Sequence, residues 1–265
     1  MAEIISITND KGGVGKTTTA VNIAVGLGQY PYKKRILVID LDAQADASDL
    51  LGWNIENEKK GYPTIYSSLA SNEQMVAYES AYENVYLVAG STNINDVEGH
   101  LRSRDVAILA LRELLEMPVK IATDGSEIDI KDFDYIFIDC PGALNLITKN
   151  ALAAADSIII PLQLEALAIR GLGGLLEAWV KVKKTVNPKL SIKGIVRCME
   201  NKQLKLSKGL NAELENEVSE FLCKTSIPRS TVVPTSQVEH NATIDSNPYS
   251  DPALAYKNLI KELFA

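Results

Sequence analysis

Two lysines lie close together around a run of glycines in residues 9–19, which read NDKGGVGKTTT. Lys11 and Lys16 are five positions apart, and Thr17 directly follows the second of them. Glycines let successive backbone N–H groups turn toward oxygen anions, and a lysine adds positive charge at the same place. A hydroxyl beside that lysine is a ligand for Mg²⁺. The stretch therefore predicts a site for a polyphosphate and a divalent cation.

Carboxylates suited to holding such a cation end two apolar segments further along the chain. RILVID (35–40) ends in Asp40, which Asp42 follows closely, and DYIFID (134–139) ends in Asp139. The apolar segment EIISIT (3–8) leads directly into the glycines. Because ligands bind at the carboxyl ends of parallel strands, we expect these aspartates and the glycine loop to converge on one edge of a sheet.

Short apolar segments alternate with helical patterns along the whole chain, which indicates parallel strands covered by helices on both sides. We expect strands at 3–8, 35–40, 84–90, 134–139, 157–163 and 192–198. We expect helices at 17–30, 105–116, 143–155, 166–186, 205–223 and 252–264, and an irregular insertion at 53–82. The sequence thus predicts an α/β fold: a single domain with a mainly parallel twisted sheet and helices on both faces.

The composition narrows the class of protein. The chain has 265 residues, of which 46% are hydrophobic and 23% charged, and its formal net charge is −7. This charge argues against a uniformly basic nucleic-acid binder but leaves room for a local basic patch. Three cysteines without a CxxC pair and two histidines suggest neither a disulfide framework nor a zinc site. Because neither a signal-peptide pattern nor a run of about 18 apolar residues is present, we expect a cytoplasmic protein.

The glycine stretch is a variant of the standard phosphate loop G-x-x-x-x-G-K-[ST], since Asp10 stands where the first glycine would be. KGGVGKTT (11–18) resembles the deviant Walker A box of the ParA, MinD and nitrogenase iron protein group. Residues 36–52 resemble the ParA switch segment DLDPQGNAS, and residues 134–172 are similar to its IDCPPSLGLLTxNAL…PVQ segment. The resemblance implies that residues 1–265 form one P-loop NTPase domain with ATPase activity. With a first strand at residue 3, we expect no N-terminal helix-turn-helix domain.

The resemblance also implies a role for each residue around the phosphates. Lys16 would bind the β- and γ-phosphates in its own subunit, and Lys11 would reach across a nucleotide-sandwich dimer to the partner's phosphates. Asp42 would orient the attacking water, which completes the catalytic set of Lys11, Lys16 and Asp42. Thr17, Asp139 and Asp40 would serve Mg²⁺, although Asp40 could instead be a buried, paired carboxylate. The loop residues implied in ATP binding are Lys11, Gly12, Gly13, Val14, Gly15, Lys16, Thr17 and Thr18.

By family position, the adenine lies between the end of the sixth expected strand and the segment IPRS (227–230). The residues implied there are Arg197, Met199, Pro228 and Arg229. Arg197 either stacks on the base or pairs with a neighbouring acid.

Three residues depart from the family pattern. Asp10 stands where relatives commonly carry Gln, Asn or Gly, and we expect its carboxylate to point away from polyphosphate, toward a cation or a backbone N–H. Ala43 and Gly142 replace prolines of the two switch segments, which should leave these loops less restrained in φ. None of the three changes removes a group that binds phosphate or metal.

Members of this family differ in the surface on which the ATP-bound dimer acts. Basic residues cluster in 181–208, and the chain ends in an apolar helical pattern that is better explained by docking on the domain than by a membrane anchor. We therefore expect no membrane partner. The candidate DNA contacts are Lys181, Lys184, Lys202, Lys205 and Lys208, and a solvated helix face is the alternative for each.

The leading hypothesis is a partitioning ATPase that uses ATP and Mg²⁺. Its ATP-bound homodimer would bind DNA non-specifically and associate with the nucleoid, and a ParB-like partner would stimulate hydrolysis, so that plasmid or chromosomal DNA is segregated. The alternative within the family is a positioning ATPase for a non-DNA cargo or one acting at a membrane. An iron–sulfur electron donor would need cysteines that bridge a cluster, and only Cys140 lies near the switch segments. A ligase or synthetase would need a substrate pocket, and the switch segment argues against it.

Overall fold

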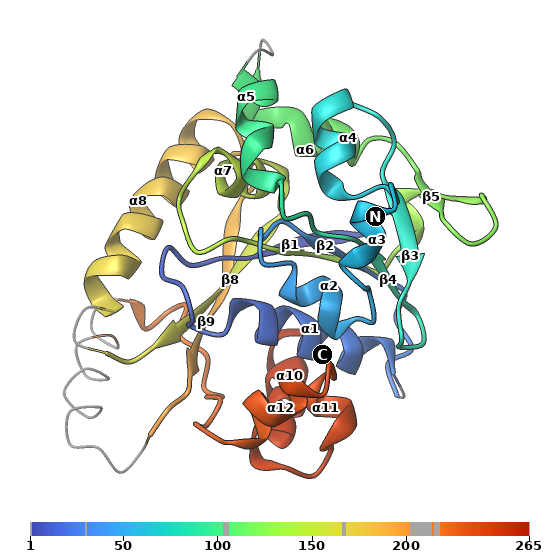
Figure 1. Ribbon diagram of the computed structural model, residues 1–265. Coiled ribbons are helices and arrows are strands. Elements are labelled where there is room, and N and C mark those ends of the chain that lie inside the picture. The colour runs from blue at the N-terminus through green and yellow to red at the C-terminus, as the bar shows by residue number, and fades with distance from the viewer. Residues whose placement is uncertain are drawn as a thin grey trace.

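One sheet organises the described part of the chain. The computed structural model of the protein describes residues 2–29, 31–102, 106–165, 168–201, 214 and 218–264. In these residues, nine strands pair in the order β6-β5-β3-β4-β2-β7-β1-β8-β9 (Figure 1). The strands are β1 (Glu3–Ile7), β2 (Ile36–Asp40), β3 (Val76–Glu79), β4 (Val85–Val88), β5 (Val119–Ile121), β6 (Glu127–Ile128), β7 (Tyr135–Asp139), β8 (Ser157–Gln163) and β9 (Ser191–Cys198).

The six strands expected from the sequence form the parallel centre of this sheet. β4, β2, β7, β1, β8 and β9 pair in parallel, so their carboxyl ends lie at the same edge. Along β2 and β7 the residues are buried on both faces, apart from the first residue of β7. Asp40 lies opposite Asp139 in the register of these two strands. The sheet therefore brings the two predicted strand-end carboxylates side by side.

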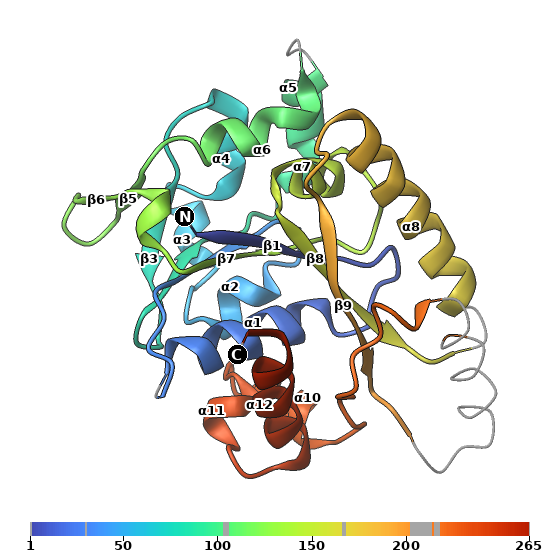
Figure 2. The same cartoon turned by 180° about the vertical axis from the view of Figure 1, so that it is seen from behind.

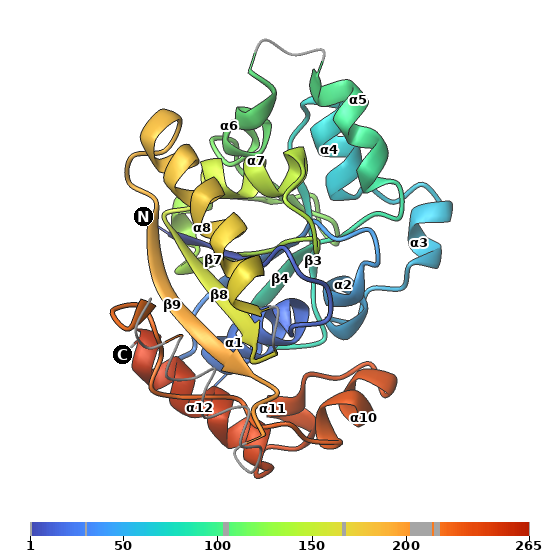
Figure 3. The same ribbon diagram turned by 90° about the vertical axis from the view of Figure 1, so that its left-hand side faces the viewer.

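Helices cover both faces of the sheet, as Figures 1 and 2 show. On one face, α1 and the C-terminal helices pack on side chains such as Phe137, and on the other α4, α6 and α7 pack on side chains such as Ile136. Figure 3 shows α8 from the side, in front of β8 and β9, on whose side chains it packs. The α-helices are α1 (Lys16–Gly28), α2 (Asp46–Leu50), α3 (Glu56–Lys59), α4 (Ile65–Ser71), α5 (Val97–Arg102), α6 (Ala110–Leu114), α7 (Leu146–Ala154), α8 (Ala168–Thr185), α10 (Val232–Val238), α11 (Thr243–Ser246) and α12 (Asp251–Phe264). The α/β prediction with helices on both faces is confirmed.

The expectation of an irregular insertion at 53–82 was wrong. These residues form α3, α4 and β3, and β3 joins the sheet antiparallel to β4. Thr64 and Ser67 begin α4 with a reciprocal capping box, which supplies hydrogen bonds that an apolar pattern alone does not reveal. The helix expected at 105–116 is interrupted, with the 3-10 turn Ala107–Leu109 preceding α6. The helix expected at 205–223 lies largely outside the described residues.

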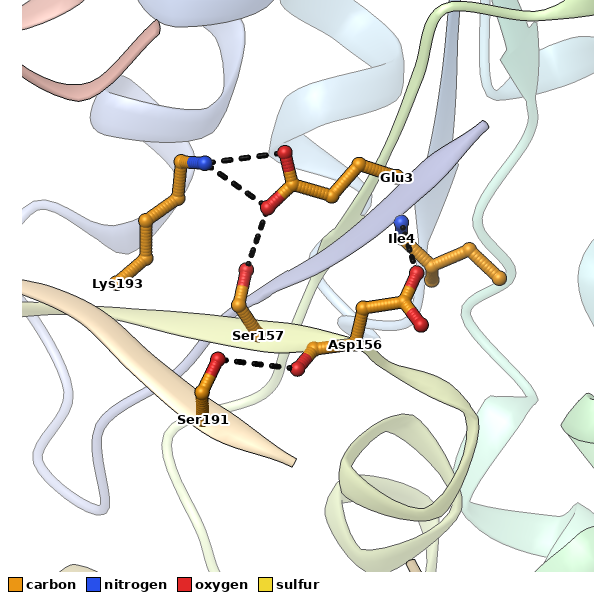
Figure 4. A network of polar contacts seen from close by, with 6 residues as sticks. All are labelled: Glu3, Ile4, Asp156, Ser157, Ser191 and Lys193. Atoms are coloured by element: carbon orange, nitrogen blue, oxygen red, sulfur yellow. Dashed lines mark hydrogen bonds and ion pairs between the residues drawn. The ribbon is translucent and has the colours of Figure 1, made fainter. Parts of the chain in front are cut away.

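The amino ends of β1, β8 and β9 are joined by polar contacts at the edge opposite the predicted phosphate site (Figure 4). Lys193 Nζ lies 2.9 and 3.0 Å from the carboxylate oxygens of Glu3, and Ser157 Oγ donates to the same carboxylate at 3.0 Å. Asp156 accepts the N–H of Ile4 at 2.9 Å. These contacts fix the relative positions of the three strands, and they engage the half-buried Lys193, one of the basic residues of 181–208, in an ion pair within the fold.

Across the described residues, none of the helices is both long enough and apolar enough to span a bilayer.

Candidate active site

The glycine loop folds as a turn that ends at the first residue of α1. Gly13 and Gly15 have φ values of 73° and 95°, in the left-handed region that side-chain-bearing residues rarely adopt. Among the described residues, no side chain caps the N-terminus of α1, and no acidic residue lies in its first turn. The N–H groups of this turn and the positive end of the helix dipole are therefore available to an anion.

Lys16 places its charge inside this turn. Only 6% of the residue is exposed, and its Nζ donates a hydrogen bond to the backbone carbonyl of Lys11 at 3.0 Å. The ammonium group is thus held against the loop whose N–H groups face the same space. A polyphosphate in this space would meet a cation and several N–H donors together.

Thr17 and Asp139 form the part of the site that fits a divalent cation. Thr17 Oγ1 donates to Asp139 Oδ2 at 2.7 Å, while the buried Asp139 Oδ1 has no hydrogen-bond partner among the described residues. Burial, reinforced by the neighbouring charge of Asp40, raises the pKa of Asp139 well above its usual range. A cation beside these oxygens would relieve that cost, because opposite charge favours the ionised carboxylate. Hydroxyl and carboxylate oxygens are the ligands that Mg²⁺ prefers, so these residues fit the ion.

Asp40 is occupied by the loop that follows it, called here the first switch loop (residues 41–47). Its Oδ1 accepts the N–H of Asp42 at 3.1 Å, and its Oδ2 accepts the N–H and the hydroxyl of Ser48 at 2.9 and 2.6 Å. Burial raises the pKa of Asp40 to about 6, although these hydrogen bonds favour its ionised form. The buried, paired alternative for Asp40 thus describes its contacts in this structure, and its role near the metal stays a prediction.

A cavity of about 580 Å³ opens beside the glycine loop and extends to the carboxyl end of β9. Of the predicted site residues it is lined by Gly12, Gly13, Gly15, Lys16, Thr17, Thr18, Asp42, Met199, Pro228 and Arg229. The remaining residues predicted for ATP and Mg²⁺ that the structure describes do not line it: Lys11, Val14, Asp40, Asp139 and Arg197. The sequence did not single out other lining residues, which include Gln44, Asp46, Ser230, Val233, Pro234, Gln237 and Tyr256. Most of these come from α10 and α12, which lie on the same side of the sheet as α1 (Figures 1 and 3).

The far end of the cavity combines apolar side chains with a strained backbone residue. Met199 has φ 52°, and Pro228 and Val233 line the same cavity. Gln237 Nε2 donates to Thr18 Oγ1 at 3.0 Å and so joins α10 to the first turn of α1. Apolar walls of this kind suit the flat face of a nucleobase.

The structure does not bring Arg197 to the cavity. Its guanidinium donates to the backbone carbonyls of Cys223 and Lys224 at 3.0 and 3.4 Å. Both hydrogen bonds are to carbonyl oxygens, and the two expectations for Arg197, stacking on the base or pairing with an acid, stay predictions. Arg197 thus links the carboxyl end of β9 to residues 223–224.

Lys11 points away from the phosphate space of its own chain. Its ammonium group forms an ion pair with Glu165, beyond the carboxyl end of β8, and the lysine side chain is 40% exposed. Its backbone N–H is held by the side chain of Asn9 at 3.1 Å. The loop therefore has one lysine directed inward and one directed outward.

The two residues that replace family prolines lie in different surroundings. Around Ala43, the first switch loop is held by hydrogen bonds from Gln44 N to Asp42 Oδ1 and from Ala45 N to Asp42 O, at 3.1 and 3.0 Å. A Cβ atom at Gly142 would lie 3.1 Å from Gly12 Cα, so the glycine permits close approach of two loops. The effect of both residues on loop motion stays a prediction.

Asp10 lies beside α8, away from the cavity. Its Oδ1 is buried without a hydrogen-bond partner among the described residues, and a Cβ atom at Gly174 would come within 3.6 Å of its Oδ2. Burial raises the pKa of Asp10, and its own backbone N–H and, to a smaller extent, the attraction of Lys16 offset part of that rise. The ionised carboxylate is thus poorly stabilised in this structure.

Asp10→Asn is expected to raise the melting temperature at pH 7–8 by a few degrees at most, because the amide carries no charge to desolvate. A raised folded-state pKa means that the folded wild type binds a proton more readily than the unfolded chain, so its stability falls as pH rises through that pKa. The difference between variant and wild type should therefore shrink toward pH 4. Thermal denaturation across pH 4–8 measures it, with the exposed Asp96→Asn as control. A variant less stable than wild type at pH 8 would show that Asp10 has a stabilising partner.

Comparison with known proteins identifies the family to which this geometry belongs. A family model described as an AAA domain matches residues 2–192. The sporulation initiation inhibitor protein Soj of Bacillus subtilis (strain 168) is 33% identical over 267 residues, covering 100% of this chain and 99% of Soj. The chromosome partitioning protein ParA of Myxococcus xanthus (strain DK1622) is 33% identical over 232 residues, covering 87% of this chain and 76% of that protein.

A solved structure with a bound ligand shares the fold. Cobyrinic acid a,c-diamide synthase from Mycobacterium smegmatis, with bound ATP analogue and magnesium, has a TM-score of 0.78 and is 26% identical over 98% of this chain and 93% of its own. The inward lysine, the uncapped start of α1 and the paired strand-end aspartates therefore occur in a fold known to hold a nucleotide. Together with its identity to ParA and Soj along most or all of its length, this assigns the chain to the ParA/MinD superfamily, as a ParA-family ATPase for positioning or partitioning.

Proposed function

We propose that the protein is a DNA-partitioning ATPase in which Mg²⁺ and ATP drive formation of a sandwich homodimer that binds DNA non-specifically. A ParB-like partner stimulates hydrolysis and releases the dimer, and plasmid or chromosomal DNA is thereby segregated in the cytoplasm. The observation that carries the proposal is the pair of lysines. Lys16 is directed into the cavity, whereas Lys11 is directed out of it toward the surface.

Each part of the chain has a defined task in this reaction. The first turn of α1 and Lys16 bind the phosphates, and Thr17 and Asp139 hold Mg²⁺, which neutralises charge on the phosphate oxygens when bound. Asp42 lies on the cavity wall and accepts two hydrogen bonds from its own loop, so it is positioned to orient a water molecule. Met199, Pro228 and Arg229 enclose the base. A second copy contributes its Lys11, so hydrolysis depends on dimerisation.

The surface of α8 supports the choice of DNA as the polymer. Lys181 and Lys184 are exposed on this helix, and Lys183 lies 5.0 Å from the ring of Trp179. Lys202, Lys205 and Lys208 lie outside the described residues. Two copies would present this basic surface twice, which raises the affinity for a polyanion without a change in the overall acidic charge.

The burial of the C-terminal helix α12 supports the proposal that the protein does not act at a membrane. Tyr256, Leu259 and Ile260 of α12 are buried in the core beside α1. Phe264 packs edge-on against Tyr135 and Phe137, with ring centroids at 5.2 and 5.9 Å. The apolar face that would enter a lipid surface is thus used inside the domain.

The double variant Lys181→Ala/Lys184→Ala is expected to weaken ATP-dependent DNA binding and to leave ATP binding unchanged. The slope of log Kd against log salt concentration should become shallower by about 1 for each phosphate that the variant no longer neutralises. Fluorescence anisotropy with duplexes of unrelated sequence measures both quantities. The matched control is Lys60→Ala/Lys131→Ala, which removes the same charge from exposed sites elsewhere. Equal affinity of the two double variants would remove α8 from the DNA surface.

A co-sedimentation experiment separates the proposal from its alternative within the family. Wild-type protein with ATP and Mg²⁺ should sediment with DNA and not with anionic liposomes. Sedimentation with liposomes alone would indicate action at a membrane, and sedimentation with neither would indicate positioning of a different cargo.

The iron–sulfur alternative is disfavoured by the position of Cys140. This cysteine is fully buried, and its Sγ lies 3.1 Å from Ser6 Oγ. Burial raises the pKa of its thiol to about 12, whereas a cluster ligand must be a thiolate. Cys140 is therefore placed as a core residue and not as a ligand shared across a dimer.

A further inference from the structure

Ser48 occupies a buried position between the first switch loop and the loop after β4. Its hydroxyl donates to Asp40 Oδ2 at 2.6 Å and accepts the N–H of Gly90 at 2.8 Å. Ser48 and Asp40 are both fully buried. The hydroxyl group thus uses both its donor and its acceptor capacity where water cannot replace either partner.

The Asp40 carboxylate, which Ser48 holds in place, in turn binds both ends of the first switch loop. The carboxylate binds the N–H of Asp42 at one oxygen and the N–H of Ser48 at the other, so it joins the beginning of the loop to α2. Between these points Ala45 has φ 54°, a left-handed conformation that costs free energy for a residue with a side chain. Such a backbone is kept only when the surroundings fix it at both ends.

The space around this carboxylate leaves little room for another arrangement. A Cβ atom at Gly90 would lie 2.8 Å from Asp40 Cγ and 3.2 Å from Ala45 Cβ. The next residues, Ser91 and Thr92, are bound by Glu58 of α3, and Thr92 N lies 3.2 Å from that carboxylate. Glu58 thus holds the loop after β4 in place, so that the N–H of Gly90 has a fixed position from which to donate to Ser48.

We propose that Ser48 is a positioning residue for the ATPase reaction, whose hydroxyl fixes the Asp40 carboxylate and thereby the place of Asp42 on the cavity wall. The proposal rests on the water-orienting role proposed for Asp42. Without the hydroxyl, Gly90 N–H loses its acceptor and Asp40 loses its shortest hydrogen bond. The carboxylate then keeps only the backbone N–H groups of Asp42 and Ser48 as donors, so its orientation is less tightly fixed and its hydrogen bond to the Asp42 N–H is weakened.

Ser48→Ala tests this directly, since it removes one oxygen atom and leaves the backbone N–H of residue 48 in place. Hydrogen exchange of the protein without nucleotide should become about tenfold faster in peptides that contain Asp42 and Gly90, because their amides lose protection. Peptides from α7 should be unchanged. The matched control is Ser68→Ala, which removes another buried serine hydroxyl, on α4.

The same variant should separate binding from turnover. Its Kd for ATP with Mg²⁺ should stay within about twofold of wild type, while kcat falls about tenfold or more because the water-orienting carboxylate is displaced. Unchanged exchange at Asp42 and Gly90 would overturn the proposal, and so would a wild-type kcat. The exchange measurement needs neither ATP nor DNA, so a failure of the DNA-partitioning proposal would leave its result interpretable.

Discussion

Lys16→Ala is expected to abolish ATP binding, with Kd rising about 100-fold or more. The ammonium group is the cation directed into the phosphate loop, and its only described hydrogen bond is to the carbonyl of Lys11. Charge-assisted hydrogen bonds contribute about 1.5–3 kcal/mol each, which corresponds to about 10- to 100-fold in affinity, and an ammonium group has three donors for the oxygens of a bound polyphosphate. Isothermal titration calorimetry with ATP and Mg²⁺ measures the loss.

The fold should survive this change, because Lys16 stabilises the loop through a single hydrogen bond. The melting temperature without nucleotide is therefore the control, and it should stay within a few degrees of wild type. Wild type should be stabilised by added ATP, whereas the variant should show no such shift. An unchanged Kd for ATP would mean that the phosphates do not bind at the start of α1.

The centre of the fold could be predicted because its strands carry their own signal. β2, β7 and β8 contain continuous apolar runs, and in β1 only Ser6 interrupts the run that follows Glu3. Runs of this type occur where helices cover both faces of a parallel sheet. The strands at the β6 edge of the sheet gave no such signal. β5 and β6 have three and two residues, too few to show a period, and they form by pairing, β5 with β3 and β6 with β5.

The phosphate end of the site could be predicted because it is local in sequence. Gly13, Gly15, Lys16 and Thr17 lie within five positions, and their conformations follow from residue type. The other end depends on residues that only the tertiary fold brings together. Val233 and Gln237 belong to α10, a short helix that contains a proline and has no clear apolar stripe, so its sequence does not mark it as the wall of a cavity.

The contacts of Asp40 show a further limit of the sequence. An aspartate at the end of a buried strand indicates that the strand ends at a functional site. The residue type alone does not tell whether the carboxylate lies beside a metal ion or holds a loop by hydrogen bonds. The difference lies in the left-handed turn at Ala45, which returns the chain so that Ser48 meets Asp40. A residue with a β-carbon is unfavourable at this φ, so the conformation of Ala45 depends on the surrounding contacts that hold it.

Lys11→Ala is expected to keep ATP binding by the monomer and to lose both stable dimerisation and hydrolysis. In the described chain Lys11 is bound to Glu165 and does not line the cavity, so removing its ammonium group leaves the chain's own phosphate site intact. A cation supplied by a second subunit to the transferring phosphoryl group contributes about 10³-fold or more to turnover in enzymes that use one. Sedimentation velocity with ATP and Mg²⁺ measures the dimer, and phosphate release measures hydrolysis. Lys60→Ala, at an exposed site on another surface, is the control.

A mixing experiment decides whether Lys11 acts on its own subunit or on its partner. Lys11→Ala and Asp42→Ala should each be inactive alone, for different reasons. In a mixed dimer, the site of the Lys11→Ala subunit has its own Asp42 and receives Lys11 from the other subunit, so it is complete. The second site of the dimer lacks both groups. If the two variants pair at random at equal concentrations, half of the dimers are mixed and roughly one quarter of all sites can hydrolyse ATP. Because Lys11→Ala weakens pairing, this quarter is an upper limit, and sedimentation velocity of the mixture measures how many dimers form. Dimers without activity in the mixture, or a Lys11→Ala variant that hydrolyses ATP at the wild-type rate, would contradict action across the dimer. Activity restored by mixing would require Lys11 to leave Glu165 and to enter the partner's site, which ties the turnover of each ATP to the presence of a second copy.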